Sequence, residues 1–347
     1  MRAMILKEFH ELRRDRRTVA MLVVMPVAML VIFGYAANFK VERLSTAIVG
    51  PQTQAVEARL VALVDTGTFD GDLLDVVHTD PAATSADARA LVRDNVADVV
   101  VDTSTTPPTV YLDGSALFAA QTADAVLGRM GNQVQVEVLF NPGLKTSWVM
   151  VPALVGLVLA FVGTIITSIG LVRERAAGTM EQLAVMPLRP IDVIVGKIVP
   201  YFVLGTVDMA IITVLGVVIF GVPFNGNVAV FALGALLFLF VVLGLGVLIS
   251  TVSQTQAQAI QGAIMVTVPQ VLLSGFIFPL TSMAVGIRWI GYCLPLTYFV
   301  QISQGVMLRG AGLASLWLPF VVLAGMAVVI VTVSVLRFRR TLAGGGS

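Results

Sequence analysis

One acidic residue stands inside a long apolar stretch, and it is the first candidate for chemistry in this sequence. Asp208 lies in the run YFVLGTVDMAIITVLG. An ionisable side chain at membrane depth costs at least about 2.5 to 3.5 kcal/mol on insertion scales, so Asp208 is expected to face protein or a wet cavity. The functional interpretation is cation contact or a proton relay. The structural alternative is that Thr206, Gln270 or backbone groups satisfy the carboxylate.

Other groups that could carry catalysis or bind a metal are scarce. The chain has one cysteine, Cys293, and two histidines, His10 and His78, which are too few and too far apart to suggest a metal cluster. The run VGK at 195–197 follows Ile191, where a phosphate-binding loop would begin with glycine. The HExxH and GxSxG motifs are also missing from the sequence. We therefore expect a chain that is not an enzyme and that has no catalytic residue, metal or cofactor of its own.

The composition indicates a membrane protein. Hydrophobic residues make up 57% of the chain and charged residues only 12%, whereas charged residues are about a quarter of a soluble domain. A spanning helix needs about 20 mostly apolar residues. Six stretches meet this requirement: 18–37, 148–172, 198–220, 228–250, 259–278 and 317–336. The predicted fold class is a polytopic α-helical membrane protein with six transmembrane helices and an inserted extracytoplasmic α/β domain.

The distribution of Lys and Arg predicts the orientation, because basic residues near span ends remain in the cytoplasm. They collect in the N-terminus 1–17, in the segment 173–197 and in the tail 337–347. Both termini are therefore expected in the cytoplasm of a multi-pass plasma-membrane protein. Residues 1–17 also space apolar side chains as an amphipathic interfacial helix does. A cleaved signal peptide is the alternative for 18–37, but its apolar run is longer than a usual signal core.

The segment 38–147 has a different character from the rest of the chain. It carries seven Lys or Arg against fourteen Asp or Glu, a net charge of −7. Runs typical of strands and helices alternate along it, which predicts a folded extracytoplasmic α/β domain. Strands are expected at 44–50, 72–80, 97–104 and 108–115, and helices at 53–67, 85–96 and 117–140.

Small residues follow one another along the second apolar stretch at spacings of three and four. A single helical face is then made of small side chains, so another helix can approach closely. Packing within one subunit and a path between subunits are both consistent with this stripe. Its members are Gly156, Ala160, Gly163, Thr167 and Gly170.

Glutamines mark the fifth apolar stretch. Gln254, Gln258 and Gln261 share one helical face, and Gln270 lies deeper. Because glutamine hydrogen-bonds across helices, the first two are expected to hold helices together, and Gln270 is expected on a transport path. The following segment, 279–316, is too broken to span and predicts an extracytoplasmic re-entrant loop or short helices.

A charged insert, RERAAGTMEQLAVMPLRP, separates the second and third apolar stretches. Thr179 and Gln182 have nearly the spacing of a capping box, and Pro187 ends the short helix that they predict. The insert is too small to be a domain and too ordered to be a slack linker. Its shape favours contact with a cytoplasmic partner.

The insert resembles that of the permease subunits of type-2 ABC exporters, which carry a RERExGTxExLxxTPLxxxExxxGKxxPY-like stretch after the second span. Met186 replaces the usual Thr, and Asp192 stands where Glu is common. SGFIFPLTSM and LPLTYFVQISQGVMLRGAG also resemble family segments, so the similarity covers nearly the whole chain. The large domain between the first two spans marks a subgroup. The residues expected to couple to an ATPase are Arg173, Glu174, Arg175, Gly178, Thr179, Glu181, Gln182, Pro187, Arg189 and Lys197.

The resemblance implies a transporter of two permeases, identical or homologous, and two ABC ATPase subunits that bind the ATP and Mg²⁺. The insert would be a coupling helix seated on the ATPase. The second and fifth spans would line a path between the permeases. Membrane lipid, and an envelope partner at the extracytoplasmic domain, are further expected partners, and nucleic acid is not.

The expected function is export of a drug-like, amphipathic or lipid-like compound. One alternative is a membrane-anchored sensor that binds a ligand through its extracytoplasmic domain. Another is an intramembrane enzyme that uses Asp208, although no partner nucleophile or metal ligand accompanies this residue.

Overall fold

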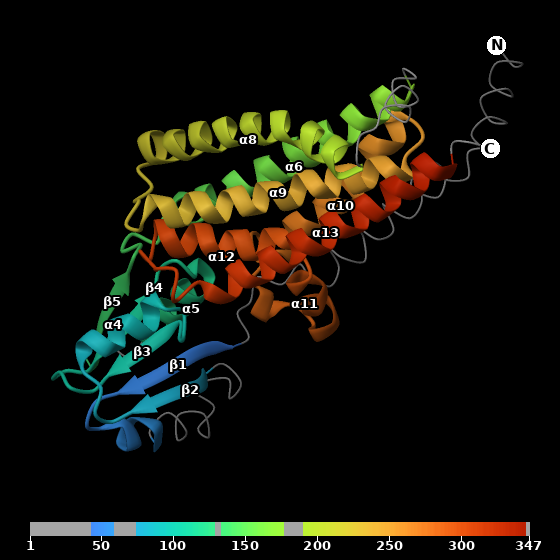
Figure 1. Cartoon of the computed structure of the whole chain (residues 1–347). Helices are drawn as coiled ribbons and strands as arrows, with labels where there is room; N and C mark the ends of the chain where they lie inside the picture. Colours follow the sequence, from blue (N-terminus) through green and yellow to red (C-terminus); the bar gives the residue numbers. More distant parts are fainter. Residues whose placement is uncertain (1–42, 59–73, 129–132, 177–189, 345–347) are drawn as a thin grey trace, which may run out of the picture.

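The structure, a computed structural model, describes residues 43–58, 74–128, 133–176 and 190–344. Two regions are visible in Figure 1: a bundle of long helices, and a sheet with shorter helices at one end of the bundle. The second region, residues 44–139, is called the α/β unit below. The predicted interfacial helix 1–17 and the predicted first span 18–37 lie outside the described residues.

The α/β unit is built on one five-stranded sheet with the order β2-β1-β3-β4-β5. β1 runs parallel to both β2 and β3, β4 is antiparallel to β3, and β5 is parallel to β4. The strands are β1 Leu44–Val49, β2 Leu74–Asp80, β3 Val99–Asp102, β4 Thr109–Asp113 and β5 Gln135–Leu139.

Two helices cover opposite faces of this sheet: α4 (Ser85–Arg93) and α5 (Leu117–Leu127). Successive side chains of a strand point to opposite faces. In β3, Val99 therefore joins the core cluster of α5, and Val100 joins the cluster of α4. The apolar run of β3 is explained by this burial on both sides.

The helix expected over 117–140 is wrong in its second half. α5 ends at Leu127, and residues 135–139 form the strand β5 instead. The run QVEVL alternates polar and apolar residues, so Val136 and Val138 pack against the cluster beneath α5 while the chain pairs with β4. Pairing with the open edge of β4 satisfies backbone groups that a helix in this place would leave unpaired on that strand.

The bundle consists of long helices and a few short ones. Among the described residues, four helices are long and apolar enough to cross a membrane, over Thr146–Gly170, Ile198–Phe220, Val228–Val252 and Trp317–Ser334. The chain is therefore a polytopic helical membrane protein. The helices that contain these stretches are α6 Thr146–Ala176, α8 Pro190–Phe220, α9 Val228–Val252 and α13 Trp317–Gly344.

The fifth apolar stretch forms an interrupted path through the bundle. α10 spans Gln256–Leu273, so it begins and ends earlier than the predicted span 259–278. Gly275 then takes a φ of +84°, a conformation that favours glycine, and the chain leaves the helix. Short helices follow in the range 279–316, where broken structure was expected: η2 Leu280–Ser282, α11 Val285–Tyr292 and α12 Pro295–Met307.

α12 continues the path that α10 leaves. α10 begins shortly after α9 ends. At the other end of α9, the backbone amide of Asn225, which lies just before this helix, donates to the carbonyl of Met307 at the end of α12, at 3.0 Å. The Asn225 side chain also donates to the carbonyl of Leu308 at 2.8 Å. α10 and α12 together therefore connect the two ends of α9, with the turn at 274–294 between them.

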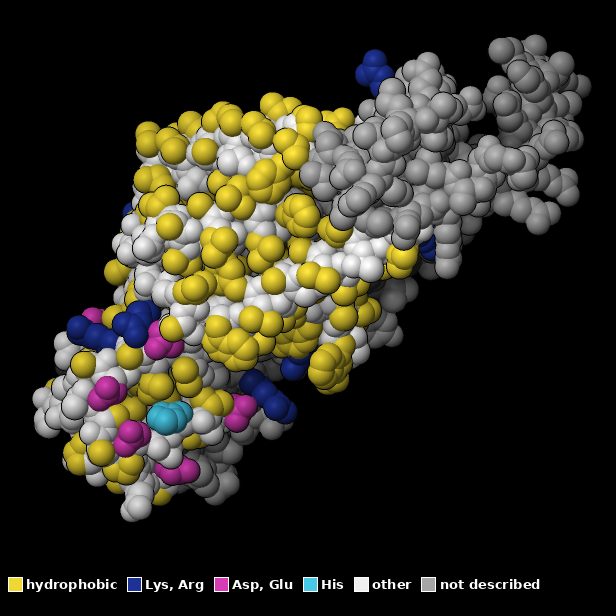
Figure 2. All heavy atoms as spheres, in the orientation of Figure 1, with side chains coloured by type: hydrophobic (Ala, Val, Ile, Leu, Met, Phe, Trp, Pro, Cys, Tyr) yellow, Lys and Arg dark blue, Asp and Glu magenta, His cyan; other side chains and the backbone are white. Residues whose placement is uncertain are grey.

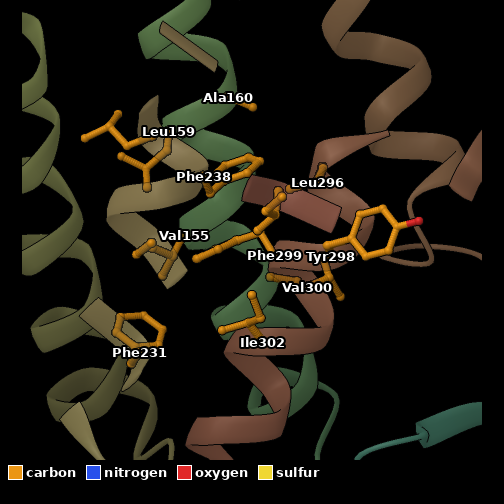
Figure 3. Packing of buried hydrophobic residues seen from close by; sticks show 14 of the residues in the cluster. Val155, Leu159, Ala160, Phe231, Phe238, Leu296, Tyr298, Phe299, Val300 and Ile302 are labelled. Atoms are coloured by element: carbon orange, nitrogen blue, oxygen red, sulfur yellow. The ribbon is translucent and has the colours of Figure 1, made fainter. Parts of the chain in front are cut away.

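The bundle core lies where α6, α9 and α12 meet. Phe238 of α9 and Phe299 of α12 stack with ring centroids 4.7 Å apart, and Val155 and Leu159 of α6 belong to the same cluster (Figure 3). Figure 2 shows hydrophobic side chains spread over the visible face of the bundle, whereas Asp and Glu gather on the α/β unit. This division agrees with a bundle surrounded by lipid and an α/β unit in water.

Candidate functional site

Four of the predicted coupling residues lie in the last turn of α6 or the first turns of α8, the helices on either side of the insert. α6 runs through Arg173, Glu174 and Arg175 to Ala176, and α8 resumes at Pro190 and includes Lys197. Arg173 is exposed. The other predicted coupling residues, Gly178, Thr179, Glu181, Gln182, Pro187 and Arg189, lie outside the described residues. The insert nevertheless joins the ends of two 31-residue helices directly.

The stripe of small residues on α6 packs at its two ends against other helices of the same chain. A Cβ added at Gly156 would overlap the Phe299 ring and lie 2.8 Å from Leu296, both on α12. A Cβ at Gly170 would overlap the hydroxyl of Tyr201 on α8. Two side chains of α12 leave no room for a side chain at Gly156, whereas at Gly170 the close atoms all belong to the end of the Tyr201 side chain.

The middle of the stripe faces α9. Ala160 and Thr167 are fully buried, and a Cβ at Gly246 of α9 would lie 2.8 Å from the Cβ of Thr167. At Gly163 the nearest neighbour of an added Cβ is Val242, at 3.3 Å. The stripe thus makes close helix contacts within one subunit. Its part in a path between subunits stays a prediction.

Gln270 is also placed inside the subunit. It is fully buried on α10, and its amide nitrogen donates to the carbonyl of Val266 at 3.3 Å. Its Oε1 atom has no hydrogen-bond partner among the described residues. Contact with a transported compound therefore stays a prediction and would require α10 to move.

Among the described residues, Asp208 has none of the partners that the structural alternative named, which were Thr206, Gln270 and backbone groups. The Thr206 hydroxyl donates to the carbonyl of Phe202 at 2.7 Å, and Gln270 is bonded within α10. Asp208 lines a cavity of about 280 Å³ between α6, α8 and α9. Within the described part of the chain, its carboxylate makes no hydrogen bond or ion pair. This cavity is called the Asp208 cavity below.

A polar junction holds the α/β unit against the bundle. Arg309 follows α12, and its Nη1 atom lies 3.5 Å from Oδ2 of Asp113 at the end of β4. The same Nη1 donates to Oδ1 of Asn95 at 2.8 Å and to Oγ of Ser115 at 3.3 Å. The side chains of Arg309 and Asp113 are 8% and 0% exposed, so this charge pair is buried.

Two further carboxylates, Asp94 and Asp98, lie beside the junction, and their surroundings shift their pKa values in opposite directions. Burial raises the pKa of Asp98, although hydrogen bonds from Ser45 oppose the shift. Burial also acts to raise the pKa of Asp94, but hydrogen bonds from Arg93 and Ser315 outweigh it, so the pKa of Asp94 is lowered. Asp94 is thus held charged at the boundary with the bundle.

Sequence reasoning missed the junction. Arg309 lies in the segment 279–316, for which a re-entrant loop or short helices were expected, and Asp113 lies inside the strand expected at 108–115. The two residues lie on elements nearly two hundred positions apart, so no local spacing connects them. The signal present in the sequence is only a lone arginine in an apolar segment, which should have a buried partner.

Comparisons with known proteins identify the family. A family model described as ABC-2 family transporter protein matches residues 16–336. The chain belongs to the ABC-2 transporter family. It is therefore a transport subunit, and the matched range includes both the insert and the α/β unit.

Several relatives of this ABC-2 protein are named permeases. The probable multidrug ABC transporter permease YbhR of Escherichia coli K12 is 29% identical over 336 residues, which cover 90% of this chain and 91% of YbhR. YbhS of the same strain, also named a probable multidrug ABC transporter permease, is 29% identical over 374 residues, covering 98% and 97%. The inner membrane transport permease YhhJ of the same strain is 32% identical over 216 residues, which cover 60% of this chain and 56% of YhhJ.

The ABC-2 family assignment favours the transporter over the sensor alternative. Permeases of ABC transporters associate with ATPase subunits and with a partner permease, which agrees with an ABC-2 chain that lacks a phosphate-binding loop of its own. The comparisons do not favour the sensor alternative, because the matched family and the named relatives are transporters.

Proposed function

We propose that this chain is the membrane-spanning subunit of an ATP-driven exporter for drug-like, amphipathic or lipid-like compounds. It pairs with a second permease, and separate ATPase subunits bind the ATP and Mg²⁺. The observation that carries the proposal is the family match over 16–336, which includes the charged insert between α6 and α8.

The topology proposed for the exporter has six passages through the plasma membrane. Residues 18–37 form the first, α10 with α12 forms the fifth, and both termini are cytoplasmic. The basic residues of the insert and of the tail support this orientation. The acidic α/β unit is then extracytoplasmic, where it can meet an envelope partner.

The geometry supports a mechanical role for the insert. A helix of 31 residues is about 45 Å long, so α6 reaches from the insert to the neighbourhood of the α/β unit. Along this length α6 packs on α8, α9, α10 and α12. A displacement of the insert by an ATPase would therefore move the helix at the centre of the subunit.

The test compares ATP hydrolysis in lipid nanodiscs by the chain alone and by its complex with a co-expressed ABC ATPase subunit. Rhodamine 6G serves as the drug-like amphipath. We expect hydrolysis only in the complex, with stimulation by the dye. Glu181→Lys should abolish the stimulation, because it reverses a charge of the proposed coupling helix.

Asp75→Lys is the matched control, since it makes the same charge reversal at an exposed residue of β2. This variant should respond to the dye as the parent does. Normal stimulation in an assembled Glu181→Lys complex would rule out the coupling role, and failure of any ATPase to associate would rule out the exporter.

A further inference from the structure

The Asp208 cavity combines an unpaired charge with apolar walls. Its lining comes from α6, α8 and α9, and besides Asp208 it consists mainly of aliphatic side chains and glycines. The polar exceptions are Thr167 and Tyr201. Thr167 is fully buried, and its hydroxyl has no hydrogen-bond partner among the described residues. Two oxygen-bearing groups in this cavity thus lack partners among the described residues.

Asp208 lies near the middle of the membrane. The apolar stretch of α8 is Ile198–Phe220, so ten residues precede Asp208 and twelve follow it. At 1.5 Å per residue, each end of the stretch is about 15 to 18 Å away. A carboxylate at this depth cannot reach the interface, and a charge there must be paired or hydrated inside the protein.

The described chain supplies no cation for this site. The lining of the Asp208 cavity contains no Lys, Arg or His. Arg309 is paired with Asp113, and Arg288 donates to the carbonyls of Thr281 and Met283, so neither is available. The described residues thus leave the complementary charge to be supplied by a bound molecule.

The cavity is suited to an organic cation more than to a metal ion. Calcium and magnesium need six or more oxygen ligands or retained water, and the side chains lining the cavity offer only Asp208, Thr167 and Tyr201. A cation with a large apolar body is weakly hydrated and would bury that body against the aliphatic walls. Tyr201 is seven residues from Asp208, almost two helical turns, and adds an aromatic ring about 10 Å away along the axis.

The cavity also has an entrance. Leu204 of α8 and Ile166 of α6 line it and are 65% and 45% exposed. It therefore opens at the bundle surface between α6 and α8, toward lipid or a second permease. Amphipathic cations concentrate in membranes and would reach this opening from within the bilayer.

We propose that the Asp208 cavity binds organic cations with an apolar, aromatic body, and that Asp208 pairs with their positive charge. The inference rests on the proposed export function. It narrows the expected substrates of the exporter to organic cations, which Asp208 would recognise by their positive charge.

The test uses two fluorescent probes of the same shape. One is the cation 4-[4-(dimethylamino)styryl]-1-methylpyridinium. The other is 4-dimethylamino-4′-methylstilbene, in which carbon replaces the charged ring nitrogen. Binding is measured by fluorescence anisotropy with the full-length chain in phosphatidylcholine nanodiscs, and empty nanodiscs provide the correction for partition into lipid.

We expect saturable binding of the cation, weakened at least about tenfold by Asp208→Asn, because a buried charge pair loses one member. The neutral probe should bind parent and Asp208→Asn equally. Thr206→Val is the matched control on the same helix, since Thr206 does not line the cavity. This variant should bind both probes as the parent does.

Leu204→Trp keeps the proposal testable if Asp208→Asn does not fold. Leu204 is exposed, so the larger side chain should be tolerated while it fills the cavity and excludes both probes. Unchanged cation binding by folded Asp208→Asn or by Leu204→Trp would overturn the proposal, as would equal binding of the two probes or no saturable binding by the parent. None of these measurements needs an ATPase. A negative result would therefore contradict the cation site and leave the proposed coupling to an ATPase untouched.

Discussion

Asp113 and Asp208 are acidic residues in two regions of the same chain, and their surroundings differ sharply. Asp113, in the α/β unit, is fully buried, lies beside Arg309 and accepts hydrogen bonds from the amide and hydroxyl of Ser115 at 2.8 and 2.6 Å. Asp208, in the bundle, is half-buried and has no ionic partner among the described residues.

The difference indicates what each residue is for. A buried charge is tolerated when hydrogen bonds and an opposite charge replace water. Asp113 has these replacements inside the protein, so its charge serves to hold the α/β unit on the bundle. Asp208 lacks them among the described residues, and the proposed cation site rests on this observation.

The largest effect is expected from breaking the junction. Arg309→Met keeps most of the side-chain volume but leaves Asp113 as a buried charge without its partner. Removing one member of a buried pair costs about 3 to 5 kcal/mol. We expect the α/β unit to detach from the bundle more readily, which hydrogen exchange of β4 and proteolysis near 140–145 would measure.

Two controls make this prediction specific. Adding Asp113→Asn to Arg309→Met should restore much of the protection, because it removes the unpaired charge. Arg89→Met makes the same chemical change at an exposed ion pair with Glu137, and such pairs are worth about 0 to 1 kcal/mol. Equal losses in Arg309→Met and Arg89→Met would show that the junction is not held by the charge pair.

A smaller loss of stability is expected from adding a methyl group to α6 where it packs closely against other helices. In Gly156→Ala the new methyl group would overlap the ring of Phe299, and overpacking of this kind costs about 1 to 3 kcal/mol. Gly163→Ala should be milder, because its nearest neighbour would be Val242 at 3.3 Å. Thermal unfolding in detergent should rank parent, Gly163→Ala and Gly156→Ala in decreasing stability. The opposite ranking of the two variants would contradict the packing described for the stripe.

The smallest effect is expected at Asp98 and Asp94, which lie beside the junction. Their contributions to the stability of the fold should depend on pH in opposite directions. Burial raises the pKa of Asp98, and the charge of Asp113 adds to the shift while Ser45 and Arg309 oppose it. The folded state therefore holds this proton more tightly, and stability is lost as the pH rises from about 3.8 through the folded pKa. Asp98→Asn should raise the melting temperature at pH 7.

Asp94→Asn should act in the other direction. The pKa of Asp94 is lowered in the folded protein, so its contribution is present at neutral pH and is lost as the pH falls. This variant should lower the melting temperature at pH 7. Melting curves between pH 3 and 8 compare the two variants, and a shift of the same sign in both would contradict the assigned environments.

The sequence predicted the features that depend on local composition and periodicity. Apolar length marked the second, third, fourth and sixth stretches, and four long apolar helices lie there. The insert was sufficient to indicate the ABC-2 family, which the family match confirms. Glycine spacing on α6 predicted close helix approach, and Gly156 and Gly170 contact α12 and α8 so closely that a Cβ would overlap them.

The two errors of element boundary lie where a local signal competes with a longer pattern. Residues 135–139 alternate polar and apolar side chains as a strand does, and they pair with the edge of β4 although a single helix was expected over 117–140. α10 ends at Leu273, and Gly275, with a φ of +84°, turns the chain toward η2, α11 and α12. Only the packing of the neighbouring strands and helices decides which signal prevails.

Composition was enough to indicate a membrane protein with one acidic segment, because hydrophobicity and charge are properties of composition, and the motif of the insert indicated the permease family. Which carboxylates have partners inside the protein became visible only in the folded chain. Asp113 meets Arg309 across nearly two hundred residues, while α6, α8 and α9 enclose a cavity beside Asp208. Whether a buried carboxylate has a partner depends on which helices and strands pack together, and that information is not contained in the spacing of residues along the chain.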